Sequence, residues 1–135
     1  MTGMTIQERI ESSLARSKAT VYLRSEFGKF GSHDQVGRAL RAIVAMGLMV
    51  KAGYGVYAKA RKSSLTGNPV PVVPLAEVGL SVLSKLGVDA QMGTAFKAYM
   101  DGRSTQVPMH DVVNVGRSRV TRKIGFGGKV VRYER

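Results

Sequence analysis

The chain has 135 residues, of which 21 are lysine or arginine and 9 are aspartate or glutamate, so its net charge is +12. Residues 1–62 hold 11 basic and 4 acidic residues and residues 63–135 hold 10 and 5, which predicts a polyanionic partner for either half. The absence of cysteine excludes disulfides, thiolate metal sites and a cysteine nucleophile, and no apolar run approaches the ~20 residues of a membrane span. Residues 1–10 also lack the apolar core of a signal peptide, so we expect a cytoplasmic protein without a membrane partner.

A first helix is predicted over about residues 5–16. Thr5 and Glu8 have the T-x-x-E spacing of a capping box, and apolar residues follow at every fourth position, namely Ile6, Ile10 and Leu14. Residues 19–23 are rich in β-branched and apolar side chains, which predicts a short strand. Residues 24–27 can then form a short helix. Phe27 in this helix, Leu23 before it and Phe30 after it are expected to face inward.

The most informative pattern in the chain is a second capped helix that starts near His33. Ser32 and Gln35 have the S-x-x-Q spacing of a capping box, in which each side chain bonds the backbone N–H of the other residue. One face of the helix is apolar: Val36, Leu40, Ile43, Val44 and Gly47. The opposite face is small, polar and cationic: Gln35, Arg38, Arg41, Ala42 and Ala45. The residues of this segment that we expect to contact DNA are Ser32, Gln35, Arg38 and Arg41. Such a face fits the major groove of DNA, where arginine bonds guanine and glutamine bonds adenine, but it is also typical of an ordinary solvated helix.

A glycine-tipped hairpin is predicted directly after this helix and favours the interpretation as a DNA-binding domain. Gly47 can end the helix in a left-handed conformation, and the β-rich segments 48–51 and 56–59 flank turn formers at residues 52–55. This order of elements predicts a winged helix-turn-helix over residues 1–60. The hairpin residues expected to contact DNA are its cations, Lys51 and Lys59, and Tyr54 at its tip. Arg61 and Lys62, just beyond the hairpin, are expected to contact DNA as well. Val56 and Tyr57 are expected to cover the helix instead.

A linker is predicted over residues 61–74, because periodicity fails there and prolines cannot donate to a strand ladder. Residues 75–135 are predicted to form a small α+β unit with helices over 75–86 and 90–100. Short β-rich pieces follow, from which we expect an antiparallel sheet: 106–107, 112–115, 119–120, 123–124 and 129–133. Cations in this tail either form a second nucleic-acid surface or line the exposed face of the sheet, and the candidates are Arg117, Arg119, Arg122 and Lys123.

Two sequence strings, GYGVYAKAR at residues 53–61 and SLTGNP at residues 64–69, resemble small bacterial proteins of the AbiEi-like antitoxin and transcriptional-regulator family. The similarity extends over residues 21–67 and 104–108. The resemblance implies an N-terminal winged helix that represses the promoter of its own operon, as part of a type IV toxin–antitoxin system. It also implies that Gln35, Arg38, Arg41, Lys51 and Lys59 occupy the family's helix and wing positions. Residues 75–135 are shorter than the usual C-terminal domain, so the resemblance supports DNA binding more than antitoxin activity.

The expected function is therefore sequence-specific binding of duplex DNA, by a transcriptional autorepressor and antitoxin. Expected partners are an operator, bound as a dimer, and a nucleotidyltransferase-like toxin that is opposed with or without direct contact. The alternatives are an RNA-binding accessory protein and an antitoxin that binds protein only.

We expect no enzyme, catalytic residue, metal or cofactor. Acidic residues are scattered, residues 125–128 lack the ending of a P-loop, and His33 and His110 each have a single neighbouring aspartate.

Overall fold

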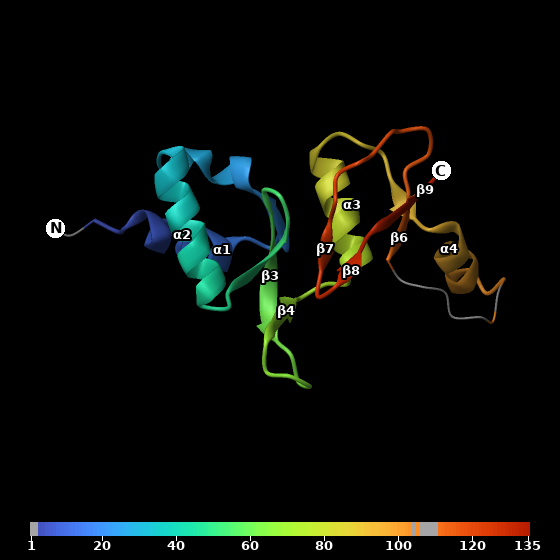
Figure 1. Cartoon of the computed structure of the whole chain (residues 1–135), viewed down its shortest axis with the longest axis horizontal. Coiled ribbons are helices and arrows are strands. Elements are labelled where there is room, and N and C mark those ends of the chain that lie inside the picture. The colour runs from blue at the N-terminus through green and yellow to red at the C-terminus, as the bar shows by residue number, and fades with distance from the viewer. Residues whose placement is uncertain (1–2, 104, 106–110) are drawn as a thin grey trace. The chain divides into compact units, whose positions relative to one another are not determined.

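The computed structural model describes residues 3–103, 105 and 111–135, which form two compact units of mixed helix and sheet (Figure 1). The first unit comprises the described residues of Met1–Lys51 and Gly55–Val72, and the second comprises Ala52–Tyr54 and the described residues of Val73–Arg135. The predicted α+β class is confirmed.

The first unit opens with the predicted helix, α1 (Ile6–Arg16). The hydroxyl of Thr5 accepts from the backbone N–H of Glu8, and the Glu8 carboxylate accepts from the backbone N–H of Thr5, both at 3.1 Å. These bonds to Thr5 lower the pKa of Glu8. The predicted strand and short helix follow as β1 (Val21–Leu23) and the 3₁₀ helix η1 (Arg24–Phe30).

The second predicted helix is α2 (His33–Ala45), and its cap is formed as expected. Gly47 has a φ of 79°, so the chain leaves the helix through the left-handed conformation that favours glycine. The apolar face of α2 packs on α1 and on the strands, and its buried residues share one core with residues of those elements: Ile10, Leu14, Tyr22, Phe27, Val36, Ala39, Leu40, Ile43, Met49 and Tyr57.

The predicted hairpin is formed by β2 (Met49–Gly53) and β3 (Val56–Lys62), and β1 pairs antiparallel with the other edge of β3. Tyr57 is nearly buried and belongs to the core that contains the buried face of α2, which confirms its expected role in covering the helix. Val56 is fully buried, but it lies on the opposite face of the strand and outside that core, so the prediction is not confirmed for Val56. The order of elements in the first unit is therefore helix, strand, short helix, helix and hairpin, as the sequence predicts.

The segment predicted to be a linker contains regular structure. Arg61 and Lys62 belong to β3, and β4 (Pro69–Pro71) pairs antiparallel with them. Ser63 N–H donates to Asn68 C=O, and Val72 N–H donates to Lys59 C=O. In this register the backbone N–H of Val70 points toward β3, whereas the backbone nitrogens of Pro69 and Pro71 point away from it. Proline is tolerated in this strand because the missing donors lie on the unpaired edge.

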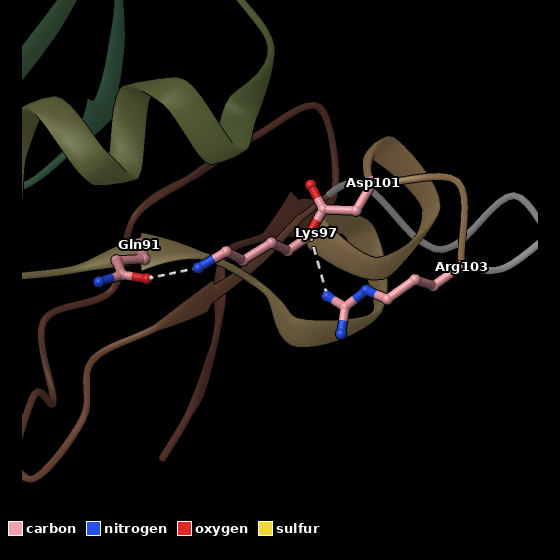
Figure 2. Close-up of polar contacts among 4 residues, drawn as sticks. All are labelled: Gln91, Lys97, Asp101 and Arg103. Carbon is pink, nitrogen blue, oxygen red and sulfur yellow. Dashed lines mark hydrogen bonds and ion pairs between the residues drawn. The ribbon is translucent and has the colours of Figure 1, made fainter.

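The second unit begins with α3 (Leu75–Lys85), close to its predicted bounds. The helix predicted over residues 90–100 is shorter: α4 covers Thr94–Met100, whereas Gln91–Met92 form strand β5. The extended chain continues to Gly93, whose N–H donates to Val112 C=O. The side-chain contacts near α4 are exposed: Lys97 Nζ donates to Gln91 Oε1 at 3.4 Å, and Arg103 forms an ion pair with Asp101 (Figure 2).

The sheet of the second unit is mixed, so the prediction of an antiparallel sheet is correct only in part. Strand β6 (Val112–Asn114) pairs antiparallel with β5 and parallel with β9 (Arg132–Glu134). A separate hairpin joins β7 (Gly125–Phe126) to β8 (Lys129–Val130) through Gly127 and Gly128, which both have positive φ. Residues 119–120 form no strand, Ile124 makes only an isolated bridge to Gly53, and the predicted strand at 106–107 lies outside the described residues.

Long-range hydrogen bonds to Glu134 hold the second unit's α4 to its sheet. The carboxylate of Glu134 accepts from the backbone N–H of Thr94 at 2.5 Å, from the Thr94 hydroxyl at 2.6 Å and from Asn114 Nδ2 at 3.2 Å. Gly93, which precedes the helix, has no side chain to cap it, so Glu134 supplies the missing acceptor from β9. The bonds from Thr94, followed by that from Asn114, lower the pKa of Glu134.

Candidate nucleic-acid interface

The outer face of α2 presents Arg38 and Arg41 to solvent. Val36, Leu40 and Ile43 are buried on the opposite side, so the helical period forces the two arginines outward. Each guanidinium group carries a positive charge and offers a planar set of donors. Of the predicted site, this helix face therefore has two arginine side chains that are exposed to solvent.

Ser32 and Gln35, both predicted to contact DNA, are exposed but are engaged in the helix cap. The Ser32 hydroxyl accepts from the Gln35 backbone N–H at 3.2 Å, and Gln35 Oε1 accepts from the Ser32 backbone N–H at 3.0 Å. Bidentate recognition of adenine uses both the oxygen and the nitrogen of a glutamine side chain. The cap uses one lone pair of Gln35 Oε1, so base recognition by Gln35 would use its second lone pair and Nε2, and it stays a prediction.

The structure adds Arg24, which the sequence analysis missed, to the arginines of α2. Its side chain extends from the start of η1 to the first turn of α2, where Nη2 donates to the His33 carbonyl at 2.6 Å. A Cβ at Gly37 would lie only 2.7 Å from that Nη2, so the absence of a side chain at Gly37 provides the space. The residues around this position line a shallow depression on the first unit: Arg24, His33, Asp34, Gly37, Arg38 and Arg41.

The sequence did contain an indication of this contact. A glycine inside a helix costs about 1 kcal/mol relative to alanine, so a glycine in the middle of a predicted helix indicates a packing reason for the missing side chain. Gly37 is such a glycine. The identity of the approaching group could not be predicted, because Arg24 is 13 positions away and several arginines of the first unit could reach the helix.

The cations of the β2–β3 hairpin have different surroundings. Lys51, Arg61 and Lys62 are exposed, and the side chain of Tyr54 is 87% exposed. Lys59 is partly buried, and its Nζ donates to the Ser17 carbonyl at 2.6 Å, at the C-terminal end of α1. A cation at this position satisfies a free carbonyl and complements the helix dipole. One of the three N–H donors of the Lys59 ammonium group is thus used within the fold, and contact with phosphate through the other two stays a prediction.

The candidate cations of the second unit are also divided between free and engaged groups. Arg117, Arg119 and Lys123 are exposed on the loop before β7. Arg122 is partly buried, and its Nη1 donates to the Tyr54 carbonyl at 2.9 Å. The hydroxyl of Tyr133 donates to the Arg122 carbonyl at 2.6 Å, and burial raises the pKa of Tyr133, an effect that the positive charge of Arg122 partly offsets.

Within the part of the chain that the structure describes, no three acidic or histidine side chains converge as a metal site would require, and no helix is long and apolar enough to cross a membrane. His110 lies outside that part. Comparisons with protein families, with curated proteins and with solved structures find no match for this chain. The function must therefore be argued from the geometry of the site.

Proposed function

We propose that this chain binds duplex DNA through its first unit, as a winged helix-turn-helix with α2 as the recognition helix and the β2–β3 hairpin as the wing. The observation that carries this proposal is the outer face of α2, where Arg38 and Arg41 are exposed. Together with Arg24 they line a depression in which Asp34 is the one acidic residue among the described residues. A helix with small and cationic residues on its free face suits the major groove.

The exposure and hydrogen bonds of each candidate residue indicate its role in this proposal. Arg38 is exposed, and its side chain makes no hydrogen bond or ion pair with any residue that the structure describes. It is therefore the principal candidate for contact with a guanine. Lys51, Arg61 and Lys62 extend the cationic surface along the strands of the hairpin, where they would neutralise phosphates. Ser32 and Gln35 fix the start of α2, and Lys59 fixes the hairpin to α1.

The resemblance of residues 53–61 and 64–69 to AbiEi-like proteins supports a more specific role for the same activity. On that basis we propose that the protein is a transcriptional autorepressor and the antitoxin of a toxin–antitoxin pair, not an enzyme. Its DNA target would then be the promoter upstream of its own coding sequence, bound as a dimer.

RNA binding by the second unit is the second candidate. The observation in its favour is a hollow in that unit, bordered by cations and by the aromatic ring of Phe126: Arg122, Lys123 and Lys129. Aromatic and cationic groups together suit single-stranded nucleic acid, because bases stack on the rings while the cations contact the backbone.

A gel-shift competition separates the two candidates. Labelled duplex DNA that contains the upstream promoter is bound by the full chain and challenged with unlabelled duplex or with single-stranded RNA of matched length. We expect the promoter duplex to compete best, random duplex less well, and RNA least. Preferential displacement by RNA would overturn the proposal and favour the second candidate.

A further inference from the structure

The contact between Arg24 and Gly37 has a consequence for how the chain holds DNA, and the inference rests on the proposed function. The position that a Cβ of Gly37 would occupy is 2.7 Å from Arg24 Nη2 and 3.5 Å from Arg41 Nη1. The guanidinium groups of Arg24 and Arg41 are therefore neighbours, although they come from η1 and α2. Like charges this close repel each other unless anions offset them, and Asp34 supplies a single carboxylate for the three arginines that line the same depression.

We propose that Arg24 and Arg41 together form a clamp for one backbone phosphate of the DNA, and that Gly37 is glycine because the clamp needs the space. Two guanidinium groups offer a phosphate several donors in planar arrays, which is the arrangement that binds phosphate most strongly. This assignment changes the role of Arg41, which the sequence analysis placed among the residues that recognise bases. Arg38 is left as the arginine of α2 that faces the base edges.

The hydrogen bond from Arg24 to the His33 carbonyl orders the clamp before DNA arrives. Arg24 is only partly exposed, and its own backbone N–H donates to the Gly55 carbonyl at 2.8 Å, in the turn of the hairpin. Both ends of the residue are thus fixed, one beside the wing and one on the recognition helix. An ordered side chain loses less conformational entropy on binding, so the clamp costs less to form than a free surface arginine would.

A purely structural role for Arg24 is the competing explanation, and substitution of Gly37 distinguishes the two. In Gly37→Ala the added methyl group collides with the end of a flexible side chain, so the guanidinium of Arg24 is displaced while the backbone of α2 keeps its path. Alanine is also the better helix former. We therefore expect Gly37→Ala to keep or raise the unfolding temperature and to weaken DNA binding.

The experiment measures the affinity of full-length variants for the promoter duplex and for a random duplex over a range of salt concentrations. We expect Arg24→Ala to weaken binding to both duplexes alike, by roughly tenfold, and to reduce the salt dependence by about one phosphate contact. Gly37→Ala should show the same loss, and adding it to Arg24→Ala should cost nothing more, because both changes remove the same clamp. Arg9→Ala, which removes an exposed arginine of α1, is the control for loss of charge alone.

The outcomes separate this inference from the proposed function. If the wild-type chain binds no duplex, both fail. If the wild type binds and Arg38→Ala weakens it, while Arg24→Ala and Gly37→Ala bind like the wild type, the proposed function stands and the clamp is overturned. A loss confined to the promoter duplex would also overturn it, because a phosphate contact is the same in every sequence.

Discussion

The first unit brings three of its arginines together at one depression beside α2, whereas the second unit distributes its cations along loops and a hairpin. The two have comparable charge surpluses, with 11 basic and 4 acidic residues in the first and 10 and 5 in the second. In the first unit, Arg24, Arg38 and Arg41 border one depression. In the second, Arg103 is paired with Asp101, and Arg122 is bonded to a carbonyl.

This difference shows that net charge predicts the kind of partner but not the place where it binds. Long-range attraction to a polyanion depends on the summed charge and is available to both units. A specific contact needs donors that are close together and oriented by the fold toward one partner. The first unit meets this requirement beside α2, where Arg24, Arg38 and Arg41 border one depression, whereas its Lys59 is partly buried and bonded to the end of α1.

The largest expected effect is the salt dependence of duplex binding, which tests whether the cations of the first unit contribute more to ionic binding than those of the second. If about six to ten phosphates are neutralised, the affinity of the full chain for duplex DNA should fall by roughly 10³ to 10⁵ between 50 and 200 mM salt. Arg38→Ala/Arg41→Ala should flatten a salt titration more than Arg117→Ala/Arg119→Ala, a matched pair from the second unit. Equal flattening by the two pairs would show that the units share the DNA, and a flat wild-type titration would contradict ionic binding altogether.

The next effect concerns sequence recognition by α2. Because Arg38 is exposed on the helix face that would enter the groove, Arg38→Ala should cost about 1–3 kcal/mol of binding free energy on the promoter duplex and much less on random duplex. Fluorescence anisotropy with both duplexes measures the difference. Arg119→Ala, in the second unit, is the control and should affect both duplexes equally. Equal losses for Arg38→Ala would assign it to phosphate.

A smaller effect should separate two lysines of the hairpin. Lys59→Ala removes the bond to the Ser17 carbonyl, so the free energy of unfolding should fall by roughly 1–2 kcal/mol. Lys51→Ala removes an exposed cation, so stability should hardly change while DNA affinity falls. Chemical denaturation and anisotropy on the same two variants check both quantities. If Lys59→Ala unfolds like the wild type, its bond contributes nothing to stability.

The smallest expected effect is a pH dependence confined to the second unit. The hydrogen bonds from Thr94 lower the pKa of Glu134 below its usual value of 4.5, so the carboxylate stabilises the fold above that value. This contribution should be lost as the pH falls below about 4.5, through the lowered pKa. Thermal unfolding between neutral and acidic pH should show it, and Glu134→Gln should remove that part of the dependence. An NMR titration that places the Glu134 pKa at or above its usual value would contradict the prediction.

The sequence by itself determined the local elements of both units. The capping boxes at Thr5 and Ser32, the helix end at Gly47 and the Gly127–Gly128 turn all depend on residues within a few positions of one another. The apolar face of α2 followed from its period, and with it the exposure of Arg38 and Arg41. Interactions of this range are encoded in adjacent sequence, so the order of elements in the first unit was predictable.

Only the tertiary structure decided what depends on partners distant in the chain. Strand β4 exists because β3 offers its edge to a proline-containing segment, and β5 displaces the start of a predicted helix because β6 pairs with it. Lys59 is bonded to the end of α1 because the fold brings the Ser17 carbonyl within its reach, and Arg24 joins the candidate interface because Gly37 leaves room. Each of these groups had several potential hydrogen-bond acceptors or neighbours. The spacing of residues in the sequence does not predict which of them it contacts, because that depends on which groups the fold brings within hydrogen-bonding distance.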